Sequence, residues 1–247
     1  MHQTGLVSIS FRTLTPEQII EVAKAAHLNW IEWGSDVHAP CTDIARLEEI
    51  AALQKAAGIR CSSYGTYFRI GVNPAEELPA YIQAAKILGT SILRLWCGNK
   101  GSELYTNAER DALYEECRKL AATAEREKVT LCMECHNGTL TDRVEAAFEL
   151  MQAVNSPAFR MYYQPNQFRT EEENITYAKR LSPYTDHIHV FNWESTNRYP
   201  LRDAIGIWRK YLNCFTGDRT LLLEFMPDNM VESLPAEANA LFEIIGG

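Results

Sequence analysis

The sequence predicts an α/β fold, a single (β/α)8 barrel that spans residues 1–247. Short β-rich runs alternate with longer amphipathic segments along the chain, which is the βαβ rhythm of a parallel sheet. The alternation repeats eight times without a Pro/Gly/Ser-rich linker, and 247 residues is the usual length of one such barrel. The Gly-x-Gly-x-x-Gly turn of dinucleotide-binding open sheets follows none of the predicted strands. These observations favour closure of the sheet into a barrel.

Each of the eight predicted strands is followed by a segment with helical periodicity. The strands are Leu6–Arg12, Trp30–Asp36, Arg60–Tyr67, Ser91–Gly98, Val129–His136, Phe159–Asn166, His187–Trp193 and Arg219–Met226. Capping boxes at Thr15, Thr106 and Thr170 predict helix starts, and Asn73-Pro74-Ala75-Glu76 predicts another. Glycines in front of three strands predict helix ends, at Gly58, Gly89 and Gly217.

Composition excludes several classes of protein. A net charge of -8 argues against a nucleic-acid partner, because phosphate backbones are bound by clustered Lys and Arg. No run of residues is apolar and long enough for a bilayer, so no membrane association is expected. The first residues lack a signal-peptide pattern, and the seven scattered cysteines indicate reduced thiols, so a cytoplasmic location is expected. Cys132 and Cys135 face opposite sides of a strand, which argues against a Cys-x-x-Cys redox pair.

Polar residues lie at the C-terminal ends of at least six predicted strands, where buried strands should be apolar. In barrels of this kind the C-terminal ends of the strands form the active site. Because residues two apart share a face of a strand, these side chains are expected to point into the barrel mouth. The set comprises Glu32 and His38, Arg94 and Trp96, Glu134 and His136, Gln164, His187 and His189, and Glu224.

Two of these glutamates and a histidine suggest a metal site. A buried carboxylate costs several kcal/mol unless an opposite charge compensates it. A divalent cation such as Mn2+ or Mg2+ compensates Glu134, His189 and Glu224 together, and it accepts mixed oxygen and imidazole ligands. The plainer interpretations remain open at this point: the glutamates pair with Arg94, and His189 is a hydrogen-bonded core histidine.

The chain resembles the xylose isomerase-like TIM-barrel superfamily of sugar and sugar-phosphate isomerases and epimerases. The resemblance covers essentially the whole chain and rests on four short motifs, one on each of four strands. They are Ile31-Glu32-Trp33-Gly34, Met133-Glu134-Cys135-His136, His187-Ile188-His189-Val190 and Leu223-Glu224-Phe225.

The resemblance implies a metal bound by Glu134, His189 and Glu224, with a fourth ligand on the sixth strand. At that place the family often has Asp-x-x-His, whereas this chain has Gln164-Pro165-Asn166-Gln167. Gln164 offers a neutral oxygen in place of a charge, so metal affinity or metal choice is expected to differ. The resemblance also implies that Glu134 and Glu224 are the acid/base pair, which moves a proton next to a carbonyl.

Six further residues are expected to touch the substrate. Arg94 is expected either to bind an anionic group or to orient Glu134, and Glu32 either joins the site or pairs with an arginine. The loop residues among the six are equally consistent with an ordinary surface loop. The six residues are His38, Arg94, His136, Gln167, Trp193 and Arg198.

The leading functional prediction is therefore a metal-dependent isomerase or epimerase of a small sugar, sugar phosphate or polyol. One alternative is an inosose dehydratase-like lyase, which begins with the same proton abstraction. Another is a non-catalytic sugar-binding barrel, which the absent aspartate on the sixth strand would explain. The DNA-repair endonucleases of the superfamily need more metal ligands and a basic face, so they fit poorly. Association into a homo-oligomer is compatible with the sequence.

Overall fold

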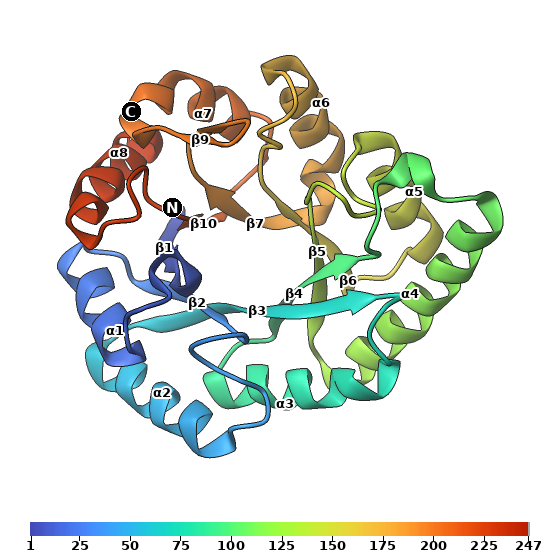
Figure 1. The fold of residues 1–247 in the computed structure, drawn as a ribbon, viewed down its shortest axis with the longest axis horizontal. Coiled ribbons are helices and arrows are strands. Elements are labelled where there is room, and N and C mark those ends of the chain that lie inside the picture. Colours follow the sequence, from blue (N-terminus) through green and yellow to red (C-terminus); the bar gives the residue numbers. More distant parts are fainter. Residues whose placement is uncertain (247) are drawn as a thin grey trace.

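Eight parallel strands close into a barrel in a computed structural model that describes residues 1–246 (Figure 1). The order around the barrel is β1-β10-β7-β6-β5-β4-β3-β2. The ring closes where the first strand pairs with the last, at Gln3 opposite Thr220. The predicted (β/α)8 barrel is confirmed. Its strands are β1 (Gln3–Val7), β2 (Trp30–Gly34), β3 (Arg60–Ile70), β4 (Ile92–Cys97), β5 (Thr130–Glu134), β6 (Phe159–Tyr163), β7 (Thr185–Val190) and β10 (Thr220–Leu223).

The helices form an outer ring around this barrel (Figure 1). The capping boxes at Thr15, Thr106 and Thr170 are all formed, and Gly58 and Gly89 end helices in the left-handed conformation. The α-helices are α1 (Pro16–Ala25), α2 (Ile44–Ala57), α3 (Leu78–Leu88), α4 (Asn107–Glu127), α5 (Val144–Val154), α6 (Glu171–Leu181), α7 (Ile205–Leu212) and α8 (Leu234–Gly246). Single 3-10 turns precede or follow several of them: η1 (Ser8–Phe11), η2 (Ala75–Glu77), η3 (Ser102–Leu104), η4 (Ser182–Tyr184), η5 (Leu201–Ala204) and η6 (Val231–Ser233).

Three details of the prediction are wrong. The first strand ends at Val7, because Ser8–Phe11 turns into a 3-10 helix instead of continuing extended to Arg12. The helix start at Asn73 begins as the 3-10 turn Ala75–Glu77, without a side-chain cap. Gly217 does not end a helix, because α7 has already ended at Leu212.

Alternating side chains separate the inside of the barrel from the helix-covered outside. Val7, Cys132, Tyr162 and Leu222 form a small buried cluster, which we assign to the inside of the barrel. Their strand neighbours belong to the large core under the helices, as Met133 does beside Cys132. All seven cysteines are free.

The loop after β7 carries a small hairpin of its own. Strands β8 (Trp193–Glu194) and β9 (Asn197–Arg198) pair antiparallel, and the hairpin lies near α7 (Figure 1). No helix within residues 1–246 has the length and apolar character needed to cross a bilayer.

Candidate active site at the barrel mouth

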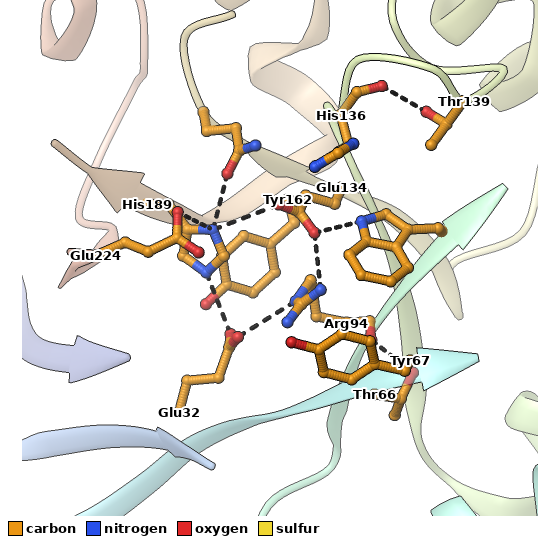
Figure 2. Close-up of polar contacts among 12 residues, drawn as sticks. Glu32, Thr66, Tyr67, Arg94, Glu134, His136, Thr139, Tyr162, His189 and Glu224 are labelled. Atoms are coloured by element: carbon orange, nitrogen blue, oxygen red, sulfur yellow. Dashed lines mark hydrogen bonds and ion pairs between the residues drawn. The ribbon is translucent and has the colours of Figure 1, made fainter. Parts of the chain in front are cut away.

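Charged side chains from five strands meet at the C-terminal end of the barrel (Figure 2). Each of them is almost completely buried, with at most 7% of its surface exposed. They are Glu32 of β2, Arg94 of β4, Glu134 at the end of β5, His189 of β7 and Glu224 immediately after β10. The sequence prediction that these positions share one mouth is therefore correct in its geometry.

Strand alternation explains why these side chains point inward. Glu134 lies two residues after Cys132, and Glu224 two residues after Leu222, and both of these apolar residues belong to the cluster inside the barrel. Residues two apart share a face, so the carboxylates continue the inner face towards the mouth. The apolar side chains inside the barrel are thus followed, at its C-terminal end, by a layer of charged side chains.

His189 lies at the centre of the group. Its Nδ1 is 2.9 Å from Gln164 Oε1, 3.5 Å from Glu224 Oε2 and 3.8 Å from Glu134 Oε1. On the other edge of the ring, Nε2 is 3.4 Å from Glu32 Oε2 (Figure 2). The imidazole therefore lies between the carboxylates instead of pointing at a backbone carbonyl, as the plainer interpretation of a core histidine would require.

Glu134 is held firmly by two donors on one of its oxygens. Arg94 Nη1 donates to Glu134 Oε2 at 2.8 Å, and the indole Nε1 of Trp96 donates to the same oxygen at 2.7 Å. The other oxygen, Oε1, faces His189. Of the two roles expected for Arg94, this hydrogen bond agrees with the second, the orientation of Glu134.

Glu224 has a different environment. Its only polar side-chain contact within residues 1–246 is the one to His189. Its backbone is fixed instead, since its amide donates to Val190 O at 3.0 Å. The next residue, Phe225, has a left-handed backbone with φ of 58°, which is uncommon for an aromatic residue and typical of functional loops.

The electrostatics separate the two carboxylates of the predicted acid/base pair. Burial opposes the ionised form of both, but Arg94, with His136 and His189, lowers the pKa of Glu134 below its usual value. For Glu224, burial disfavours the ionised form more strongly than the nearby positive charges favour it. The negative charge of Glu134 acts in the same direction as burial, so the pKa of Glu224 is raised.

His189 and Glu32 are both stabilised in their charged forms. Burial disfavours the imidazolium, yet the carboxylates of Glu224 and Glu32 raise the pKa of His189 to about 9. Burial likewise opposes ionisation of Glu32, but the positive charges of Arg94 and His189 hold its pKa well below the usual range. The mouth thus has a strong preference for a cation.

The donor set fits a divalent metal ion. Glu134, His189 and Glu224 each offer one ligand atom, and these atoms lie within 4.8 Å of one another. Arg94 is the one Arg or Lys side chain that is buried among residues 1–246, and it faces three buried carboxylates. A histidine that binds a metal is neutral, so in the metal-bound state three carboxylates and one guanidinium would leave two negative charges in excess, which a divalent cation would balance. Gln164 Oε1 lies beside His189 Nδ1, so it could serve as a neutral fourth ligand.

A cavity of about 180 Å³ opens beside Glu134, Gln164 and Glu224. Four of its wall residues are aromatic, and polar groups complete the lining. The wall consists of Glu134, His136, Asn137, Gln164, Gln167, Phe168, Phe191, Trp193, Glu224 and Phe225. Three of the predicted substrate contacts, His136, Gln167 and Trp193, are therefore in place to meet a ligand.

Two of these wall residues have atoms available to a ligand. His136 Nδ1 donates to the carbonyl of Asn137 at 2.7 Å, which leaves Nε2 to contact a ligand. The buried indole nitrogen of Trp193 has no hydrogen-bond partner within residues 1–246.

The other three predicted substrate contacts do not line the cavity: Arg94, which contacts Glu134, and His38 and Arg198. His38 is buried, with Nδ1 3.0 Å from Ser8 Oγ and Nε2 3.1 Å from Leu14 O, so both ring nitrogens are engaged. Its partner Ser8 lies in the turn that replaces the end of the first predicted strand. Arg198 stacks on the outside of the wall, 4.3 Å from the Trp193 ring centre and 4.5 Å from that of Phe225.

Sequence reasoning left two contributors without a definite role. Trp96 was placed at the mouth, but nothing in the sequence indicates that its indole reaches Glu134. For Glu32 the sequence allows either a place in the site or an ion pair with an arginine. Its contacts with both Arg94 and His189 depend on strands that are far apart in the chain. The signal that pointed to both was a polar or amphipathic side chain at the end of a buried strand.

Comparison with known proteins agrees with this architecture. The sequence profile described as xylose isomerase-like TIM barrel matches residues 20–211. A search of curated protein sequences gives no significant match.

Three solved structures illustrate the likeness of the fold. The probable 3-DHS dehydratase AsbF of Bacillus anthracis, involved in petrobactin synthesis, shares 18% identity with a TM-score of 0.81, and 98% of each chain is covered. A xylose isomerase-like TIM barrel protein of Mycobacterium smegmatis, in complex with magnesium, shares 13% identity with a TM-score of 0.73 over 99% of this chain and 97% of that one. An L-ribulose 3-epimerase shares 13% identity with a TM-score of 0.72 over 100% of this chain and 95% of that one. The profile match extends over most of the barrel, so the chain belongs to the xylose isomerase-like TIM barrel family.

Proposed function

We propose that the protein moves a proton at a carbon next to a carbonyl group, acting on a small sugar or polyol derivative as a metal-dependent isomerase or epimerase. The observation that carries this proposal is the group of three buried carboxylates and one guanidinium around His189, of which the carboxylates of Glu134 and Glu224 line the cavity. Such a cluster is costly in a structural role and well suited to a divalent cation and a base.

Four residues would hold the metal: Glu134 through Oε1, His189 through Nδ1, Glu224 through a carboxylate oxygen and Gln164 through its amide oxygen. When bound, a divalent cation draws electrons from the carbonyl oxygen and makes the neighbouring C–H more acidic. The three charged or imidazole ligands match those that the sequence predicted, and the neutral Gln164 makes this set less charged than the family's usual one.

The two carboxylates are suited to different roles. Glu134 Oε2 is occupied by Arg94 and Trp96, so Glu134 serves as a fixed, ionised anchor. Glu224 lacks such donors, so we assign to it the removal of the proton from carbon and its return. Proton return to the neighbouring carbon converts an aldose into a ketose, whereas return to the opposite face of the same carbon gives the epimer and requires Glu134 to give up a proton. The firm hold of Arg94 on Glu134 favours the first outcome.

A dehydratase is the second candidate, and it is favoured by the likeness to the probable dehydratase AsbF. Its first step is the same abstraction by Glu224, after which the C–O bond β to the carbonyl breaks and the hydroxyl group leaves as water with the proton that Glu224 has taken up. This reaction also needs only one base, so it agrees with the unequal environments of Glu134 and Glu224.

The test is incubation of the Mn2+-loaded protein with a panel of aldoses, ketoses and inososes in D2O. We expect deuterium at the carbon next to the carbonyl, and loss of that exchange in Glu224→Gln. Glu237→Gln is the matched control, because Glu237 is a buried carboxylate on α8, outside the cavity.

Product analysis then separates the candidates: an isomer or epimer retains the elements of water, and a dehydratase product lacks them. Exchange that continues undiminished in both Glu134→Gln and Glu224→Gln would refute the assignment. Substrate binding without any exchange would indicate the sugar-binding alternative.

A further inference from the structure

Glu32 lies beneath the proposed metal ligands and is completely buried on β2. Its Oε2 accepts a hydrogen bond from Ser63 Oγ at 2.9 Å and lies 3.4 Å from His189 Nε2. Its Oε1 accepts from Arg94 Nε at 3.2 Å. Figure 2 shows this carboxylate reaching the histidine on one side and the arginine on the other. Both of its oxygens are therefore used, and Glu32 does not line the cavity.

The contact with His189 determines which ring nitrogen is available to a metal. Nδ1 faces Gln164, Glu224 and the cavity, whereas Nε2 faces the carboxylate of Glu32. An ionised carboxylate only accepts hydrogen bonds, so Glu32 holds a proton on Nε2. Without a metal, Nδ1 donates to Gln164 Oε1; a metal ion would replace that proton and bind the Nδ1 lone pair, while the Nε2 proton stays with Glu32. A metal-bound histidine is commonly oriented in this way by a carboxylate on its other nitrogen.

Through its contact with Arg94, Glu32 also affects the orientation of a second proposed ligand, Glu134. Arg94 uses Nε for Glu32 and Nη1 for Glu134 Oε2, so the guanidinium is a bridge between the two carboxylates. With Oε2 occupied, Glu134 presents Oε1 to the cluster. One side chain on β2 thus orients groups on β4, β5 and β7.

The local sequence is adapted to this arrangement. The pairing of β2 with β3 shifts register between Ile31 and Glu32, so that Glu32 is opposite Ser63. Such irregularities re-aim side chains next to functional sites. A Cβ on Gly65 would lie 2.6 Å from Glu32 Oε1 and 2.8 Å from Arg94 Nη2, so a larger residue here would displace one of these two side chains.

We propose that Glu32 is a positioning residue for metal binding, which fixes the Nδ1-ligating form of His189 and, through Arg94, the ligating oxygen of Glu134. This inference rests on the proposed metal site and assigns to Glu32 a role beyond an internal ion pair. An ion pair that only stabilised the fold would affect unfolding and leave the affinity of the folded protein for metal unchanged.

The first experiment measures Mn2+ affinity by calorimetry in the wild type, Glu32→Gln and the control Glu237→Gln. Removal of an outer partner of a metal ligand weakens metal binding by about 10- to 100-fold, and we expect that loss in Glu32→Gln only. Circular dichroism and the unfolding midpoint establish that the variant is folded. Folded Glu32→Gln with wild-type affinity overturns the inference.

A second variant keeps every charge and is informative if Glu32→Gln fails to fold. Gly65→Ala pushes against the Glu32 carboxylate and Arg94, and we expect weaker Mn2+ binding here too. Gly206→Ala on α7 is its matched control, because a Cβ there meets nothing within 4 Å. Unchanged affinity in folded Gly65→Ala counts against the inference in the same way.

The wild-type protein provides a measurement that needs no variant. Nitrogen-15 NMR of the Zn2+-loaded protein is expected to show His189 ligating through Nδ1 with a proton on Nε2. Ligation through Nε2 with the proton on Nδ1 would overturn the inference about Glu32, but it would leave the proposed reaction unaffected. Conversely, a wild type that binds neither Mn2+ nor Zn2+ refutes the proposed metal site itself, so the two failures are distinguishable.

Discussion

The amide of Phe225 donates a hydrogen bond to Ser10 Oγ at 2.8 Å, and this bond joins the turn after β1 to the residue that follows Glu224. It stabilises Phe225 in its left-handed conformation and so fixes the direction in which the Glu224 side chain leaves the backbone.

Ser10→Ala tests the importance of this link. The loss of one partner of a partly buried hydrogen bond destabilises a protein by about 1–3 kcal/mol. We expect a decrease of that size in the free energy of unfolding, together with a lower turnover number, since Glu224 is less well oriented. Urea denaturation and steady-state kinetics are the measurements, and a destabilised variant with wild-type turnover would contradict the role of the turn.

Gln164→Glu adds a carboxylate of similar length beside His189 Nδ1. We expect Mn2+ to bind about tenfold more tightly, equivalent to about 1.4 kcal/mol. The metal-free variant should be less stable than the wild type, because one more negative charge is buried. Titration calorimetry and melting curves with and without Mn2+ check both effects.

Gln167→Glu is the control for this substitution. Gln167 lines the same cavity but has no hydrogen bond to His189 within residues 1–246. A gain in affinity equal to that of Gln164→Glu would show that general negative charge, and not ligation by residue 164, is responsible.

Trp96→Phe removes the indole donor to Glu134 and retains an aromatic ring at the mouth. A hydrogen bond to a charged group contributes about 1.5–3 kcal/mol, so we expect a measurable loss of turnover as Glu134 becomes less well fixed. Trp33→Phe is the comparison, because Trp33 donates a similar bond to Gln54 far from the cavity. Equal kinetic losses in both variants would indicate a general effect of tryptophan removal.

Glu237 provides a pH test outside the site. It is buried against η5, accepting a hydrogen bond from the Leu201 amide, and burial raises its pKa above the ordinary 4.5. The folded state therefore favours the protonated acid, and its contribution to stability is lost as the pH rises through the raised pKa.

The measurement compares the free energy of unfolding of the wild type with that of Glu237→Gln between about pH 4 and about pH 8. We expect the wild type to become less stable relative to the variant as the pH rises, because Gln cannot ionise. A difference that grows in favour of the wild type would reverse the sign and contradict the effect of burial.

The main features of the barrel were predictable because they are local. Eight buried strands, three capping boxes and the positions of Glu134, His189 and Glu224 follow from side-chain alternation and from residues three apart. Each of these patterns is complete within one segment of the sequence.

The remaining features depend on contacts between distant segments. The position of Ser8 in a turn, and hence the hydrogen bond that occupies His38, could not be inferred from a run of residues that is apolar enough to continue as a strand. The roles of Glu32 and Gly65 require the register of β2, β3 and β4 around a closed ring. Sequence spacing along one strand does not contain that information.

The pairing of Gln3 with Thr220 has a consequence for how the protein is made. The charged groups of the mouth are distributed from residue 32 to residue 224, so a nascent chain still growing on the ribosome cannot assemble them until the eighth barrel strand has emerged. Contacts of such large sequence separation form late and slowly. A cation at the mouth would therefore be acquired only after synthesis of the barrel is complete, and its uptake would report that the ring has closed.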